Sequence, residues 1–310
     1  MTTKLKKPFA LQMMALLALF ACPTTAHAEF EIKETTVEKG EVELEYKGDY
    51  HSGNPNRKFG LDGGEIIADE NDILRQSHSF ELGLGLTDYL KISVGTEAEE
   101  ERFDDVDGVD VVNAFDSLKF TALEANATLA LIKPTTSGFS LAAYVGIEHA
   151  FEKSEGEIAR IGPLLSVTQG RWSATANLLF AKHFGGNDAE ENSDDRWDFE
   201  YAAQVAYQMN DQLTLALESY GLIKRLGSSG TPGDGAVLFG DQDQYRLGPV
   251  AYYTFKRGAN DSGAMKLGKS DDDEEGEDDE GGVTMNLGVL LGLNGDTPDT
   301  TLKWGVSAGF

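Results

Sequence analysis

Apolar and polar residues alternate with a period of two along most of the chain. In residues 74–86, for example, Phe80, Leu82, Leu84 and Leu86 share one face, and polar residues or glycines take most of the other. Because successive side chains of a β-strand point to opposite faces, this period predicts strands with one apolar and one polar face. Twelve segments show the pattern: residues 41–50, 74–86, 89–97, 115–131, 139–151, 158–167, 171–184, 197–209, 212–226, 243–256, 283–293 and 301–310.

The connections between these segments alternate between short and long. The short ones are residues 87–88, 134–138, 169–170 and 210–211, and the long ones are residues 52–72, 98–114, 185–195 and 227–242. Short periplasmic turns and long extracellular loops are typical of barrels in the bacterial outer membrane. An even number of strands also brings both ends of the barrel to the periplasmic side.

A soluble β-sandwich is the rival interpretation, because its two sheets also bury apolar faces against each other. A membrane barrel should in addition carry aromatic residues near its strand ends, as belts at the lipid–water interface. Such residues lie on the apolar parity: Tyr46, Tyr50, Phe139, Phe151, Trp172, Phe184, Trp197, Tyr207, Tyr245, Phe255, Trp304 and Phe310. We therefore predict an all-β fold, a transmembrane antiparallel up-and-down β-barrel of about 12 strands with long acidic extracellular loops.

The N-terminal residues predict export. Three lysines before position 8 precede an apolar stretch at 9–21 and a small-x-small site that ends at Ala28. We expect residues 1–28 to be a secretory signal peptide and residues 29–310 to form a single barrel domain. A lipoprotein signal with lipidation at Cys22 is the alternative.

The last strand carries apolar residues at every second position and ends on an aromatic residue. We expect Trp304 and Phe310 to form the assembly signal that the barrel-assembly machinery reads. The predicted location is the outer membrane of a Gram-negative bacterium, with outer-membrane lipid and lipopolysaccharide as surroundings.

The chain is strongly acidic, with a formal net charge of -27. Acidic residues cluster in 97–110, 188–198 and 271–280, so nucleic acid is excluded as a partner. Residues 257–282 lie on the short-turn side, and we expect them to form a disordered periplasmic insert. Divalent cations are expected to condense diffusely on the acidic loops, but the spacing of a specific metal site is absent from 271–280.

The polar parity predicts which side chains line the lumen. The charged candidates for a constriction are Arg75, Glu81, Lys91, Glu124, Glu148, Arg160, Glu200, Glu218, Lys224 and Arg246, and Lys303 shares their parity. Two interpretations stay open at this point. The charges either select solutes in a polar conduit, or they pair and fill a narrow barrel as a wet core.

The sequence does not predict an enzyme. His149 and Ser219 both have the outward parity, but they belong to strands that are not neighbours. The G-x-S-x-G match at residues 305–309 lies inside the predicted last strand and not at a strand-to-helix turn, so it forms no nucleophile elbow, and the spacing of zinc ligands is absent. We therefore assign no catalytic residue and no cofactor.

Two hairpins resemble a known family. Residues 248–253 (GPVAYY), 287–294 (LGVLLGLN) and 297–304 (TPDTTLKW) are similar to the bacterial outer-membrane proteins grouped as "MetA-pathway of phenol degradation", and residues 81–90 (ELGLGLTDYL) resemble that family's early hairpin. The resemblance implies a barrel with an uptake role, linked to hydrophobic or aromatic compounds. It implies no catalytic residues.

We therefore expect a passive channel or transporter for small solutes, hydrophobic or aromatic in kind. The alternative is a structural or surface-interaction barrel with a plugged lumen and cation-binding acidic loops. An open water path through the lumen would favour the first, and a closed set of charge pairs the second.

Overall fold

The structure is a computed structural model that describes residues 30–53, 58–61, 64–67, 73–103, 118–133, 138–151, 156–185, 196–224, 226, 229, 244–255, 282–295 and 297–310. The predicted signal peptide at 1–28 and the acidic run at 271–280 lie outside these residues. Within the described part of the chain, no helix is long and apolar enough to cross a membrane.

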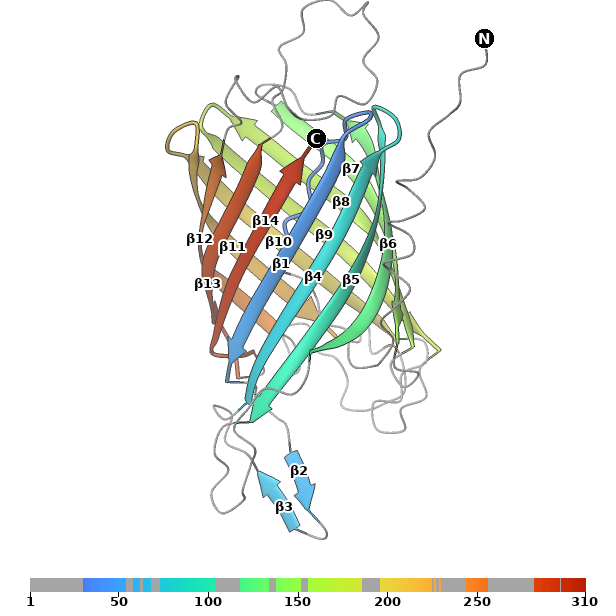
Figure 1. The fold of residues 1–310 in the computed structure, drawn as a ribbon, viewed down its shortest axis with the longest axis vertical. Coiled ribbons are helices and arrows are strands. Elements are labelled where there is room, and N and C mark those ends of the chain that lie inside the picture. Colours follow the sequence, from blue (N-terminus) through green and yellow to red (C-terminus); the bar gives the residue numbers. More distant parts are fainter. Residues whose placement is uncertain are drawn as a thin grey trace, which may run out of the picture.

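The described residues form fourteen strands: β1 (Val42–Ser52), β2 (Lys58–Leu61), β3 (Gly64–Ile67), β4 (Ile73–Gly85), β5 (Leu90–Phe103), β6 (Lys119–Ile132), β7 (Gly138–Ala150), β8 (Glu157–Gln169), β9 (Trp172–Phe184), β10 (Trp197–Gln208), β11 (Leu213–Ile223), β12 (Gln244–Phe255), β13 (Val283–Gly292) and β14 (Thr300–Gly309). All but β2 and β3 join in one closed barrel, in the order β1-β14-β13-β12-β11-β10-β9-β8-β7-β6-β5-β4 (Figure 1). β1 closes the ring, because it pairs antiparallel with β14 and with β4. The predicted all-β, twelve-stranded up-and-down barrel is confirmed.

The wall of the barrel is apolar outside and polar inside. On the outer face, Phe80 and Leu287 are 49% and 58% exposed. On the inner face, Glu148 and Glu218 are 1% and 0% exposed. A soluble protein has the opposite distribution, whereas a barrel in lipid needs this one.

Two of the predicted short turns lie where the sequence indicates them. Gly170, with a φ of 60°, turns the chain from β8 into β9. Between β10 and β11, Asn210 Oδ1 accepts hydrogen bonds from the N–H groups of Gln212 and Leu213, both at 2.9 Å. Glycine tolerates the positive φ and asparagine bonds the backbone of its own turn, which is why these residue types predict turns.

Two connections predicted as loops contain strand residues. β5 continues to Phe103, beyond the predicted end at residue 97, because Glu99 and Glu101 pair with Ser77 and Arg75 of β4. The long connection at 52–72 contains the β2–β3 hairpin. Neither stretch shows clean apolar alternation, and pairing of the backbone with a neighbouring strand decides its conformation.

Residues 30–39, called the N-terminal segment from here on, run inside the barrel before the chain enters its wall. Gly40 has a φ of 85°, and its N–H donates to the carbonyl oxygen of Gly85 at 2.7 Å. The chain therefore reverses at Gly40, between the N-terminal segment and β1. Thr35 and Val37 are 4% and 5% exposed, so the segment is enclosed by the wall. The period-two pattern did not predict this arrangement.

Gly85 is expected to be needed for the docking of the N-terminal segment. A Cβ atom at Gly85 would overlap the carbonyl oxygen of Glu38, whereas one at Gly83 would meet the flexible end of Lys91 at an ordinary 3.4 Å. We expect Gly85→Ala to displace the segment and the matched Gly83→Ala to leave it in place. Trypsin cleavage of the folded barrel after Lys39 should be on the order of tenfold faster in Gly85→Ala, because cleavage follows the released population. Equal cleavage of the two variants would contradict this role.

Candidate functional site

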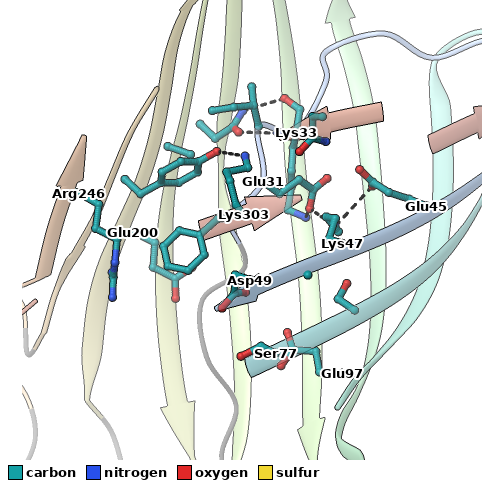
Figure 2. A pocket seen from close by; sticks show the side chains of 18 of the residues that line it. Glu31, Lys33, Glu45, Lys47, Asp49, Ser77, Glu97, Glu200, Arg246 and Lys303 are labelled. Atoms are coloured by element: carbon teal, nitrogen blue, oxygen red, sulfur yellow. Dashed lines mark hydrogen bonds and ion pairs between the residues drawn. The ribbon is translucent and has the colours of Figure 1, made fainter. Parts of the chain in front are cut away.

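A cavity of about 280 Å³ lies inside the barrel, lined by side chains of the wall and of the N-terminal segment. The side chains labelled in Figure 2 are charged, with the exception of Ser77. Six of the ten predicted lumen residues line this cavity: Arg75, Lys91, Glu124, Arg160, Glu200 and Arg246. These six side chains therefore lie on the inner face of the wall.

Arg160 on β8 joins three of the predicted carboxylates. Its Nε lies 2.9 Å and 3.2 Å from the two carboxylate oxygens of Glu200 on β10. Its Nη1 donates to Oε2 of Glu148 on β7 and lies 4.0 Å from Glu124 on β6. These groups are largely removed from water, so removing the guanidinium would leave buried charges without compensation.

Glu218 on β11 is the centre of a second buried network. Lys303 on β14 donates to its Oε2 at 2.8 Å, and the Tyr220 hydroxyl donates to the same oxygen at 2.5 Å. Gln204 and Tyr252 both donate to Oε1, the former at 2.8 Å. Glu218 is 0% exposed, so these donors replace the water that its charge loses.

Four further predicted lumen residues lie on β4, on β5 and directly after β11. Lys91 on β5 forms an ion pair with Glu43 on β1. Arg75 on β4 is 4% exposed. Glu81 pairs in register with Glu45 but lies outside the set of cavity-lining residues, and Lys224 directly follows the end of β11.

The N-terminal segment is fixed to the wall by side chains of β7 and β9. Asn177 holds the backbone of Lys33 on both sides: its Oδ1 accepts from the Lys33 N–H at 2.7 Å, and its Nδ2 donates to the Lys33 carbonyl at 2.9 Å. The hydroxyl oxygens of Thr35 and Ser140 lie 2.7 Å apart. Asn177 and Ser140 are 2% and 1% exposed, so these are interior contacts.

Charges of the N-terminal segment are matched by charges of β1. Figure 2 shows Lys47 between Glu31 and Glu45, at 2.7 Å and 3.5 Å. Lys33 lies 2.5 Å from Glu31, and its ammonium group is 5.0 Å from the centre of the Tyr144 ring. The N-terminal segment thus adds charged side chains to the lumen, and Glu31 forms an ion pair with Lys47 of the wall.

Phe30 occupies an aromatic and cationic recess. Its ring meets the Tyr220 ring edge-on at 5.3 Å and the His51 ring at 5.7 Å. The guanidinium carbon of Arg246 lies 4.8 Å from its centre, within the range of a cation–π contact. Phe30 also packs against the buried cluster that contains Val250. The recess therefore binds a benzene ring beside a positive charge.

The two residues of the predicted assembly signal lie on the closing strand β14 or directly after it. Phe310 pairs with Val42 through two backbone hydrogen bonds of 3.1 Å and 2.9 Å, and its side chain is 63% exposed. Trp304 lies in the middle of β14, where its indole N–H donates to the Tyr46 hydroxyl at 3.3 Å. Tyr46 and Trp304 were expected in the belts near strand ends; instead, they pair at mid-strand, beside the space that Gly48 leaves.

Some lumen residues were not among the predicted candidates. Glu43, Glu45, Lys47 and Asp49 alternate along β1 and line the cavity, so the parity rule could have found them. The sequence contains no comparable indication that Phe30, Glu31 and Lys33 line the cavity, because the N-terminal segment is not a strand and the parity rule does not apply to it. His149 and Ser219 lie on β7 and β11, which are not neighbours in the barrel.

Comparison with known proteins supports the fold. No family model matches the chain, and no curated protein does. Among solved structures, the chain is similar to the COG4313 outer membrane channel from Pseudomonas putida F1, with 11% identity, a TM-score of 0.55, and coverage of 93% of this chain and 100% of that one. A weaker likeness to the NanC porin has 10% identity and a TM-score of 0.47, and covers 86% of this chain and 98% of that one. The class of protein is thus a closed antiparallel barrel whose fold is shared with a solved outer-membrane channel.

Proposed function

We propose that this chain is a passive channel in the outer membrane of a Gram-negative bacterium and that small solutes pass through its lumen. The observation that carries the proposal is the charge-lined cavity inside a closed barrel. The N-terminal segment occupies part of this lumen, connects to the wall at Gly40 and is held by hydrogen bonds and ion pairs. A segment of this kind can leave, whereas wall side chains cannot.

Because the N-terminal segment lies in the lumen, we expect it to move when solutes pass. Its hydrogen bonds to Asn177 and Ser140 contribute on the order of 1 kcal/mol each. The ion pair between Glu31 and Lys47 is largely buried, but both groups recover their hydration when the segment leaves, and this offsets much of the lost attraction. Contacts of this strength permit reversible release within the lifetime of the folded barrel.

We further propose that the solutes are hydrophobic or aromatic. The recess that holds Phe30 offers the rings of Tyr220 and His51 and the guanidinium of Arg246. Release of the N-terminal segment would free these groups for the ring of a solute, and the positive charge would favour an aromatic acid. The resemblance to the family "MetA-pathway of phenol degradation" points to the same solute class.

The alternative, a structural barrel with a plugged lumen, is favoured by one observation. The charges of the lumen are extensively paired, as around Arg160 and Glu218, and the N-terminal segment occupies part of the lumen. The two functions differ in whether the N-terminal segment is ever released. Export through residues 1–28, recognition of Trp304 and Phe310 by the assembly machinery, and the acidic periplasmic insert at 257–282 stay predictions under either function.

Planar-bilayer recording of the purified protein tests the proposal. A channel gated by the N-terminal segment should show discrete steps between a closed and an open level. Protein that inserts, as shown by heat-modifiable migration in electrophoresis, but never produces a step would support the structural alternative.

A further inference from the structure

Three buried carboxylates converge on one point of the lumen wall. Glu97 on β5, Glu124 on β6 and Glu148 on β7 each present a carboxylate oxygen, and these oxygens all lie within 4.8 Å of one another. The three residues are 6%, 7% and 1% exposed. Carboxylates this close in an interior repel one another strongly, and the guanidinium of Arg160, which contacts Glu148 and Glu124, is shared with Glu200 as well.

Glu148 supplies an independent sign of a missing ligand. Its Oε2 accepts from Arg160, but its Oε1 is buried and has no hydrogen-bond partner among the described residues. Both oxygens belong to the same carboxylate, so Oε1 is no further than one carboxylate width from the oxygen that faces the cluster. A buried carboxylate oxygen without a donor is costly, and a metal ion is one of the few groups that would satisfy it.

The backbone beside Glu97 contains a β-bulge. The β5–β6 ladder changes register between Glu97 and Ala98, so one extra residue of β6 is accommodated opposite them. Bulges of this kind re-aim a side chain and occur next to functional sites. Glu97 and Glu124 line the internal cavity, which gives an ion a path to the cluster.

The spacing of the oxygens fits calcium. Ca²⁺ binds carboxylate oxygens at roughly 2.3–2.6 Å, so oxygens that lie within 4.8 Å of one another can all bind one ion. Mg²⁺ demands near-ideal octahedral geometry, whereas Ca²⁺ accepts irregular sets of oxygen ligands, which suits carboxylates fixed on three strands of a rigid wall. Three carboxylates, with water in the remaining positions, form a suitable set of hard ligands for Ca²⁺.

We propose that Glu97, Glu124 and Glu148 bind one Ca²⁺ ion in the lumen wall and thereby join β5, β6 and β7. Arg160 remains on Oε2 of Glu148, and the ion occupies the side of Oε1. This site goes beyond the proposed channel function. It also differs from diffuse condensation on the acidic loops, because it is buried and has a fixed stoichiometry.

Equilibrium dialysis of the folded, detergent-solubilised protein with radioactive ⁴⁵Ca²⁺ tests the site. At about 0.15 M NaCl the exposed acidic loops are screened, so we expect one saturable ion per chain. Glu97→Gln, which leaves the described contacts of Arg160 intact, should abolish this binding. The matched Glu43→Gln, which removes a lumen carboxylate that pairs with Lys91, should keep it.

Glu148→Gln serves as a second variant if Glu97→Gln does not yield heat-modifiable, folded protein. Binding that is unsaturable, or that persists in both variants, would overturn the proposal, as would equal displacement by Mg²⁺ at the same concentration. Calcium binding does not require conduction. A protein that binds the ion but shows no channel steps would therefore refute the proposed function alone.

Discussion

A protein that carries Thr35→Cys and Ser140→Cys is expected to pass no current while the new disulfide is intact and to open when dithiothreitol is added. The hydroxyl oxygens of the two native residues lie 2.7 Å apart, one on the N-terminal segment and the other on β7. The hydrogen bond between the two hydroxyl groups holds the two Cβ atoms near each other, and a small shift of the N-terminal segment would bring them to disulfide distance. Since Cys22 is the only native cysteine and lies in the predicted signal peptide, no other cysteine of the barrel domain competes for pairing.

We expect the current to be lost completely, because the disulfide prevents the release of the N-terminal segment instead of making it less frequent. Single-channel recording before and after reduction is the measurement, and the two single-cysteine variants are the controls. They should behave like the native protein with and without reductant. Equal open probability of the oxidised and reduced double variant would show that solutes do not need the N-terminal segment to move.

Replacing Lys303 by methionine is expected to lower the free energy of unfolding by about 3–5 kcal/mol. The Glu218 side chain is 0% exposed and that of Lys303 is 6% exposed, so the variant leaves a buried carboxylate without its cation. Tyr220 still donates to Glu218, but a neutral hydroxyl does not replace the charge. Urea unfolding of the refolded barrel in lipid gives this value.

A matched lysine and a compensating change control this experiment. Lys91 also pairs with a lumen carboxylate, but the side chains of Lys91 and Glu43 are 20% and 26% exposed. Lys91→Met should therefore lower the free energy of unfolding by clearly less than Lys303→Met does. Adding Glu218→Gln to Lys303→Met should recover part of the loss, because the amide carries no charge. If the Lys303 and Lys91 variants had the same free energy of unfolding, the burial of an ion pair would not determine how much its loss destabilises the barrel.

The wall of the barrel could be predicted because its physics is local and periodic. Each strand contacts lipid on one face and the lumen on the other, so a period of two is imposed on residues such as Phe80 to Leu84. Turn residues such as Gly170 and Asn210 act on their own backbone and are equally local. The extension of β5 escaped prediction, since Glu99 and Glu101 follow no apolar alternation and are held by pairing with β4.

The partners inside the lumen could not be predicted in the same way. Parity places Arg160 and Glu200 on the inner face, but which strands approach each other across the lumen depends on tilt and stagger. The pairing of Lys303 with Glu218 joins strands that are not neighbours in the barrel order. The position of the N-terminal segment is even harder to predict from local sequence, because it depends on contacts with Asn177 and Ser140, which are more than 100 residues away in sequence.

The central claim is that the lumen conducts small solutes, and uptake into proteoliposomes tests it most directly. Benzenesulfonate is a suitable tracer, because it is an aromatic anion that crosses lipid poorly, and glucose is the comparison. We expect benzenesulfonate to enter proteoliposomes faster than protein-free liposomes, with a smaller gain for glucose, and Asn177→Ala to accelerate both by loosening the N-terminal segment. Entry at the protein-free rate, for both solutes and for both proteins, would contradict the account.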